Sequence, residues 1–143
     1  RDMETTPNGT TYVVAELPSR FYKTTDGVTW SKFLNFLSNP SDLFMLDNNT
    51  GYLISSNGSL TKTTDGWETF SNVNYGSVVT YDRIYFVNQN VGFIAGYRRF
   101  IQKTLDGGQT WTGITIPSTL MSSGIDITDI KAFGIRAKYY INF

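Results

Sequence analysis

The chain has 143 residues, enough for a domain with a hydrophobic core of its own, and 40% of them are hydrophobic. Twelve basic residues balance twelve acidic ones, so we do not expect the basic stripe that nucleic-acid binders carry. The sequence contains no cysteine and no histidine, which excludes disulfides, thiolate or imidazole metal sites and a histidine base. We therefore expect no metal, no cofactor and no nucleic-acid partner.

No apolar run reaches the length of a membrane span, and no signal peptide pattern is present. The sequence begins at Arg1 and not at methionine, so we expect either a processed protein or a piece of a longer one. The sequence predicts no insertion into a membrane.

The first part of the chain predicts an incomplete unit of short strands. Residues 1–9 are polar and end in a Pro-Asn-Gly turn signal, so we expect an irregular start without a strand. Runs rich in β-forming residues follow, with a loop between the first two. The predicted strands of this unit are 11–15, 21–23 and 30–33, and the loop is 16–20.

The next two units are complete, with four short strands each and turn residues between them. The second unit predicts strands at 43–46, 51–55, 60–62 and 69–73. The third unit repeats that pattern 41 residues later, with strands at 84–87, 92–96, 100–103 and 110–114. The tail then starts a fourth unit with strands at 125–133 and 138–143.

One stretch recurs three times, between the last two strands of each of the first three units. Its aspartates, Asp26, Asp65 and Asp106, follow one another at intervals of 39 and 41 residues. Asp-Gly is a strong hairpin signal, and both Asp and Thr side chains can hydrogen-bond to the amides of a turn. The shared residues are Thr24, Asp26, Gly27, Trp30, Thr63, Asp65, Gly66, Phe70, Thr104, Asp106, Gly107 and Trp111.

This stretch resembles the Asp-box, or BNR repeat, with the pattern S/T-x-D-G-G-x-T-W. The third copy matches throughout, the second has Trp67 and Phe70 in place of a glycine and the final Trp, and the first is one residue shorter. Asp-boxes occur on β-propellers of sialidases, xyloglucan-cleaving glycosidases, sortilin-type receptors and photosystem assembly factors. The resemblance implies that the box is a structural turn, away from the binding face.

A period of about 40 residues with four antiparallel strands is typical of propeller blades. We therefore predict an all-β fold of four-stranded blades that form an incomplete ring. The blades are expected at about 11–33, 42–73 and 83–114, with a partial blade at 125–143. A fragment of a longer propeller, a ring closed by two chains, and an array whose tail supplies the missing first strand of the first unit all remain open.

The loops opposite the boxes are the expected binding face, because propeller loops there are free to vary. Arginines gather in these loops, and guanidinium groups grip carboxylates bidentately. Four surface arginines paired with nearby acids are the simpler interpretation. The candidate contact residues on this face are Arg20, Arg83, Tyr97, Arg98 and Arg99.

Trp67 replaces a turn glycine and is expected at a hairpin tip. Either it is exposed and contacts a sugar or a protein, or it folds back on Tyr52 or a neighbouring blade. Carboxylate-pair hydrolysis needs two acids across a cleft. Asp42, Asp82 and Asp129 recur with the repeat, which favours a structural role for them. No catalytic residue is predicted.

The sequence thus favours a non-catalytic recognition or scaffolding module that binds protein or carbohydrate, alone or as a homo-oligomer. One alternative is a fragment of an Asp-box glycoside hydrolase of the sialidase or xyloglucanase kind. Another is an assembly chaperone like the photosystem factors, for which Arg98 and Arg99 are the only hint. We expect a secreted, periplasmic, surface or virion-associated protein.

Overall fold

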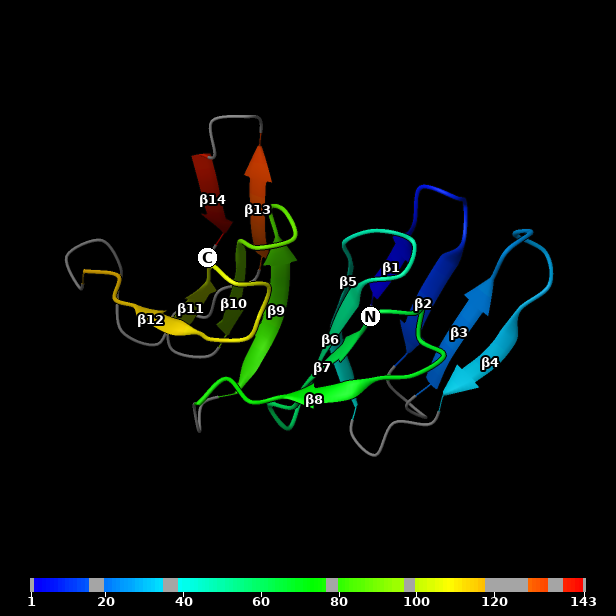
Figure 1. The fold of residues 1–143 in the computed structure, drawn as a ribbon, viewed down its shortest axis with the longest axis horizontal. Helices are drawn as coiled ribbons and strands as arrows, with labels where there is room; N and C mark the ends of the chain where they lie inside the picture. The colour runs from blue at the N-terminus through cyan, green and yellow to red at the C-terminus, as the bar shows by residue number, and fades with distance from the viewer. Residues whose placement is uncertain are drawn as a thin grey trace.

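The chain folds into small antiparallel sheets that stand one after another in sequence order (Figure 1). The structure is a computed structural model, and it describes residues 2–15, 20–34, 39–76, 80–96, 100–117, 129–133 and 138–142. We call the first four-stranded sheet blade 1. Its strands, in spatial order, are β1 (Asp2–Thr5), β2 (Thr11–Ala15), β3 (Arg20–Thr24) and β4 (Ser31–Leu34).

Two further sheets repeat this order, and a two-stranded sheet follows them. Blade 2 consists of β5 (Pro40–Met45), β6 (Gly51–Ser55), β7 (Leu60–Thr63) and β8 (Ser71–Val73). Blade 3 consists of β9 (Tyr81–Phe86), β10 (Gly92–Gly96), β11 (Ile101–Thr104) and β12 (Thr112–Ile114). The half-blade consists of β13 (Asp129–Phe133) and β14 (Lys138–Asn142).

The first strand of every sheet lies innermost. β1 contacts β5, β5 contacts β9, and β9 contacts β13, so the inner strands follow one another around a centre. All residues of β6 and β10 are buried, because a sheet packs on each face of blades 2 and 3. In β2 buried and half-buried residues alternate, since blade 1 has a neighbouring sheet on one face within the described residues.

Hydrophobic clusters fill the spaces between successive sheets. Blades 1 and 2 enclose Tyr12, Val14, Phe21, Leu43, Met45, Leu53 and Trp67. Blades 2 and 3 enclose Tyr52, Ile54, Leu60, Tyr75, Tyr81, Ile84, Phe86 and Ile94. A smaller cluster of Phe93, Ala95, Ile101 and Ile130 joins blade 3 to β13. Burial of these side chains is the main force that holds the sheets together.

A glycine begins the second strand of blades 2 and 3 because a side chain of the first strand lies against it. A Cβ on Gly51 would lie 2.4 Å from Met45 Sδ, and a Cβ on Gly92 would lie 2.6 Å from the Phe86 ring. Real Cβ atoms essentially never approach that closely. A side chain at Gly92 would therefore displace the Phe86 ring, and one at Gly51 would displace the flexible side chain of Met45.

The structure confirms the predicted all-β fold with four-stranded antiparallel sheets. The prediction of a strandless start is wrong, because Asp2–Thr5 forms β1 and pairs with β2. The alternative in which the tail supplies a first strand for the first unit is therefore wrong as well. Residues 125–128 of the predicted tail strand lie outside the described residues. No helix in the described part of the chain is long and apolar enough to cross a membrane.

Candidate functional site

The Asp-box of blade 3 is a turn held by its own side chains. The Thr104 hydroxyl donates to Asp106 Oδ1 at 2.8 Å and accepts the Gly108 amide at 2.9 Å. Asp106 Oδ1 also accepts the amides of Gln109 and Thr110, at 3.0 and 2.9 Å. The Thr110 hydroxyl donates to Asp106 Oδ2 at 2.5 Å. Both carboxylate oxygens are thus committed to the turn.

Blade 2 repeats this arrangement although a tryptophan replaces the second glycine. Thr63 donates to Asp65 Oδ1 at 2.9 Å and accepts the Trp67 amide at 2.9 Å. Thr69 donates its amide at 2.9 Å and its hydroxyl at 2.6 Å to the two oxygens of Asp65. The backbone network of the box therefore does not depend on glycine at this position, although Trp67 has a φ of 70° there.

The shorter first box is also held by hydrogen bonds to its own Thr and Asp side chains. Asp26 Oδ1 accepts the amides of Val28 at 2.9 Å and Thr29 at 2.7 Å, and Thr24 accepts the Gly27 amide at 3.0 Å. An open groove of about 420 Å³ lies beside this box and includes Asp26 in its lining. Because Asp26 Oδ1 accepts the turn amides, we assign this aspartate a structural role in the turn.

These hydrogen bonds favour the charged form of the box carboxylates. The Thr110 hydroxyl, followed by the Thr110 amide, lowers the pKa of Asp106 to about 2. The Thr29 amide holds the pKa of Asp26 well below its ordinary value. The Thr69 hydroxyl does the same for the pKa of Asp65. A carboxylate that stays ionised at neutral pH is a poor general acid, so the boxes are not suited to acid catalysis.

The boxes also join neighbouring blades. At the junction of blades 2 and 3, the Gly107 carbonyl accepts the Tyr52 hydroxyl and Lys62 Nζ, both at 3.0 Å. Lys62 Nζ also lies 5.2 Å from the centre of the Tyr52 ring, within the range of a cation–π contact. One residue pair of blade 2 thus holds one backbone carbonyl of the next box.

The junction of blades 1 and 2 has the same elements with a different pairing. The Tyr12 hydroxyl donates to the Gly66 carbonyl at 3.3 Å. Lys23 Nζ lies 5.7 Å from the Tyr12 ring centre and 3.5 Å from Glu68 Oε1 of the blade 2 box. The recurrence of Tyr12 and Tyr52 opposite a lysine is visible in the sequence, and it was a usable signal for these contacts.

Trp67 is fully buried, with 0% of its surface exposed. Its ring packs edge-on against Phe21 of blade 1, with 5.3 Å between ring centres, and its Nε1 donates to Met45 Sδ at 3.1 Å. The idea of an exposed sugar- or protein-contacting tryptophan is therefore wrong. Trp67 folds back on a neighbouring blade, as the other interpretation predicted, but that blade is blade 1 and the contact is not with Tyr52.

Acidic side chains link the inner strands. Asp2 Oδ2 accepts the Leu43 amide at 3.1 Å, and Asp42 Oδ2 accepts the Ile84 amide at 2.8 Å. Burial raises the pKa of Asp42 to about 8, and the neighbouring Asp2 adds to the shift while the Ile84 amide opposes it. Burial and Asp2 also raise the pKa of Glu4, to about 7. Sequence reasoning missed Asp2 and Glu4 because it expected no strand there.

Strand register shows that Asp42 corresponds to Asp2 and to Arg83, and not to Asp82. Asp42 lies opposite Ile54, and Arg83 lies opposite Ala95. Ile54 follows Leu53 and Ala95 follows Ile94, and Leu53 and Ile94 are equivalent positions in the second strands of blades 2 and 3. The predicted recurrence of Asp42 with Asp82 is therefore off by one residue. At this position the inner strands of blades 1, 2 and 3 carry Asp2, Asp42 and Arg83.

The structure does not bring the candidate arginines together. Arg20 begins β3 of blade 1, where its Nη1 donates to the Tyr22 hydroxyl at 3.4 Å. Arg83 lies in β9 of blade 3, where its Nη1 donates to the Asp82 carbonyl at 2.7 Å. Burial raises the pKa of Asp42, and the charge of Arg83 opposes part of that rise. The whole of blade 2 separates them. Tyr97, Arg98 and Arg99 lie outside the described residues.

Four-stranded antiparallel sheets, each with an Asp-box turn and joined through their inner strands, define the Asp-box β-propeller class. Residues 22–134 match the family described as Photosynthesis system II assembly factor YCF48. The chain belongs to this family. No curated protein matches it.

Two solved structures share the fold at low sequence identity. One is described as YCF48 bound to D1 peptide, with a TM-score of 0.75 and 16% identity over 98% of this chain and 46% of that one. The other is YCF48 from Cyanidioschyzon merolae, with a TM-score of 0.80 and 15% identity over 99% of this chain and 47% of that one. The chain therefore spans less than half the length of either structure. Both likenesses support the β-propeller fold of this chain, whose described sheets do not close a ring.

The comparisons correct the expected localisation and narrow the range of expected partners. The family is described by the assembly of photosystem II, so the expectation of a secreted, periplasmic, surface or virion-associated protein is wrong. Among the predicted partners a protein is supported by the relative with its peptide. Carbohydrate, glycoside hydrolase character and a homo-oligomer receive no support from these matches.

Proposed function

We propose that this chain is a protein-recognition module of an assembly factor, which binds a polypeptide segment of a partner and catalyses no reaction. The observation that carries this proposal is the family match over residues 22–134, whose description is an assembly factor. The box geometry supports it, because all three aspartates serve turns. Of the three functions that the sequence left open, this is the assembly-chaperone alternative.

A peptide of a photosynthetic membrane protein is the partner that we propose. A structure with the same fold is described as bound to a D1 peptide. A short segment suits a surface of small blades, because extended peptides bind along loops and strand edges without a deep cavity. In the described residues no group of three or more acidic side chains is placed to hold a metal ion, and the proposal needs none.

We propose the loop face opposite the Asp-boxes as the contact surface. Arg20 is the first residue of β3 and Arg83 is the third residue of β9, and the sequence assigns Tyr97, Arg98 and Arg99 to the loop after β10. Guanidinium groups bind carboxylates bidentately and at fixed geometry. The recognised segment is therefore expected to carry acidic side chains or a free C-terminal carboxylate.

Fluorescence anisotropy with a labelled D1 peptide tests this proposal. We expect saturable binding by the chain, and a loss of at least about fivefold in affinity, roughly 1 kcal/mol, for Arg83→Gln and for Arg98→Gln combined with Arg99→Gln. Lys32→Gln is the matched control for Arg83→Gln, because Lys32 is exposed on β4 and both changes remove one positive charge.

Asp106→Asn separates binding from folding. We expect this variant to melt at a lower temperature and to bind the peptide as tightly as the original chain below that temperature. No binding of the D1 peptide, or equal losses for the arginine variants and Lys32→Gln, would show that the loop face does not recognise such a segment.

A further inference from the structure

Two carboxyl groups meet between the inner strands of blades 1 and 2. The side chain of Asp2 on β1 is hydrogen-bonded to that of Asp42 on β5. An ionised carboxylate only accepts hydrogen bonds, so two carboxyl groups bond to each other only when one of them carries a proton. Burial is the largest cause that raises the pKa of Asp42, to about 8, which identifies Asp42 as the group that holds the proton at neutral pH.

Both side chains also bind backbone amides of the neighbouring inner strands. Asp2 Oδ2 accepts the Leu43 amide of β5 at 3.1 Å, and Asp42 Oδ2 accepts the Ile84 amide of β9 at 2.8 Å. Oδ1 of Asp42 is therefore the oxygen that is left to carry the proton. The two carboxyl groups thus connect β1 to β5 and β5 to β9.

The charged groups around Asp42 determine what happens when it ionises. Within the described residues, these are Asp2 of β1 and Arg83 of β9. On β1, Glu4 interacts with Asp2, and burial followed by the charge of Asp2 raises the pKa of Glu4 to about 7. The strands β2 and β6 also pack on β5 and contain no charged residue. An ionised Asp42 would therefore stand between the negative charge of Asp2 and the positive charge of Arg83.

This cluster lies at the loop face. β1 runs in the same direction as β3, because both are antiparallel to β2, and β3 ends at a box. β1, β5 and β9 therefore begin at the end opposite the boxes, and Asp2, Asp42 and Arg83 are first or third residues of these strands. Arg83 is a proposed contact residue, and it directly precedes Ile84, whose amide Asp42 holds.

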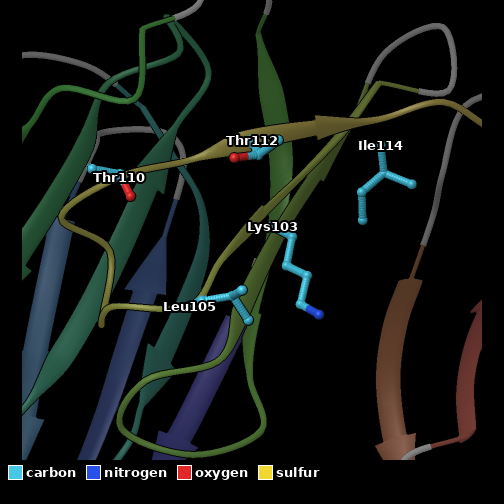
Figure 2. Close-up of a pocket in the computed structure, with 5 residues that line it drawn as sticks. All are labelled: Lys103, Leu105, Thr110, Thr112 and Ile114. Atoms are coloured by element: carbon cyan, nitrogen blue, oxygen red, sulfur yellow. The ribbon is translucent and has the colours of Figure 1, made fainter.

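The two grooves beside the boxes offer no comparable contact. The lining of the groove beside blade 3, which has a volume of about 270 Å³, contains no carboxyl group. Figure 2 shows its side chains, Lys103, Leu105, Thr110, Thr112 and Ile114. In the groove beside blade 1 the carboxylate is Asp26, whose Oδ1 accepts two amides of its own turn. A contact that depends on a shared proton is therefore found at the inner strands and in neither groove.

We propose that Asp42 donates a proton to Asp2 and thereby forms a pH-sensitive clasp across the inner strands, which favours peptide binding at the loop face while the proton is held. As pH rises through about 8, the proton leaves to solvent and the two carboxylates repel each other. The contact between β1 and β5 then weakens, and the ionised Asp42 competes with an acidic peptide for the Arg83 guanidinium. The effect on binding rests on the proposed function, whereas the clasp itself does not.

An NMR titration of the complete chain tests the clasp without a peptide. The amide nitrogen shifts of Leu43 and Ile84 are followed from about pH 6 to about pH 9. We expect both to change with a common midpoint at about pH 8, because both amides are bound to the pair. In Asp42→Asn the side-chain amide replaces the proton donor, so neither shift should change.

Glu4→Gln is the control for this titration and is expected to keep the common midpoint. Amides of Leu43 and Ile84 that respond at different pH values, or not at all, would overturn the proposal whatever the peptide does. Loss of the response in Glu4→Gln would overturn it as well, because Glu4 and not Asp42 would then be the titrating group.

Anisotropy with the labelled D1 peptide tests the effect on binding. At constant ionic strength we expect the original chain to bind roughly fivefold more weakly at about pH 9 than at about pH 6, and Asp42→Asn to bind equally at both. Glu68→Gln is the matched control, because it also removes one carboxylate but lies in the box of blade 2, and it should keep the fivefold change.

The two measurements separate this inference from the proposed function. Binding by the original chain that does not depend on pH, or a response that persists in Asp42→Asn, would overturn the effect on the loop face. If the Leu43 and Ile84 amides titrate together but the peptide binds at neither pH, the clasp is supported and the proposed function fails.

Discussion

The two internal junctions bury their large aromatic side chains from different positions of the box. Between blades 1 and 2, the indole of Trp67 fills the space, at the position that Gly108 occupies in blade 3. Between blades 2 and 3, Tyr52 stacks on Phe86 with 4.0 Å between ring centres, and Trp111 packs edge-on against Phe86. A Cβ on Gly108 would lie 3.4 Å from the Tyr52 ring and 3.5 Å from Trp111, in ordinary van der Waals contact, so aromatic rings already surround this position.

This difference shows that the hydrogen bonds of the box and its hydrophobic packing vary independently. The hydrogen bonds of Thr and Asp are the same in both boxes, because they depend on the local turn. The packing is exchangeable, because an indole can come from the second residue after the aspartate, as in Trp67, or from the fifth, as in Trp111, provided that the partner blade leaves room. Within this chain the box is therefore a repeated turn with a variable hydrophobic contact.

The largest expected effect comes from giving blade 2 the residue of blade 3. Trp67→Gly relieves a positive φ but empties a fully buried site beside Phe21 and Met45. We expect a loss of roughly 3–5 kcal/mol in the free energy of unfolding, measured by chemical denaturation. Trp30→Ala is the control, since Trp30 is 45% exposed, and a comparable loss there would contradict the comparison.

The inner strands predict a second difference, in pH dependence. Burial and Asp2 raise the pKa of Asp42 to about 8, so the folded state holds a proton that the unfolded chain has released above its ordinary pKa. Stability from this group is complete below that ordinary value and is lost as pH rises towards about 8. Asp42→Asn keeps an acceptor for the Ile84 amide and should flatten this decline in melting temperature. An unchanged pH profile would contradict the prediction.

The box carboxylates give the opposite sign. Because hydrogen bonds from Thr110 lower the pKa of Asp106, its contribution is present above the ordinary pKa of an aspartate and is lost as pH falls towards about 2. Asp106→Ala is expected to lower the melting temperature by several degrees and to remove part of the acid sensitivity. The test compares melting curves at neutral and acidic pH, and equal slopes for both proteins would rule out this role.

The smallest expected effect concerns the hydroxyl groups at the junctions. Tyr52→Phe removes the 3.0 Å hydrogen bond to the Gly107 carbonyl and should cost about 1 kcal/mol. Tyr12→Phe should cost less, because its bond to Gly66 is 3.3 Å long. Both variants copy the residue that blade 3 has at this position. Denaturant midpoints that reverse this order would show that the hydroxyls do not set the strength of the junctions.

The sequence was most informative where turns are marked by Gly, Asn and Asp. The strands of blades 2 and 3 were predicted nearly in full, because each is bounded by such residues and rich in β-formers. β1 was missed because its residues alternate between half-buried and exposed, with Met3 63% exposed and acids on the other positions. β1 lacks the apolar face by which the other inner strands, β5 and β9, are identified in the sequence.

The contacts between blades were less accessible. The burial of Trp67 depends on the space between blades 1 and 2, and the size of that space cannot be derived from a single sequence. The repeated Tyr–Lys pairs could have been noticed, since Tyr12 and Tyr52 recur with the repeat. Their bonds to Gly66 and Gly107 follow only from the way in which successive sheets stack.

The order of the strands in each sheet is their order along the chain, and this has a kinetic consequence. Every hairpin can close over a short stretch of polypeptide, so folding does not wait for distant segments to meet. Within the described residues, blade 2 alone has a four-stranded sheet on both sides. Amide protons are therefore expected to exchange slowest in β6 and faster towards both ends of the array, because the terminal sheets have a neighbour on one face only and open locally at a lower free energy.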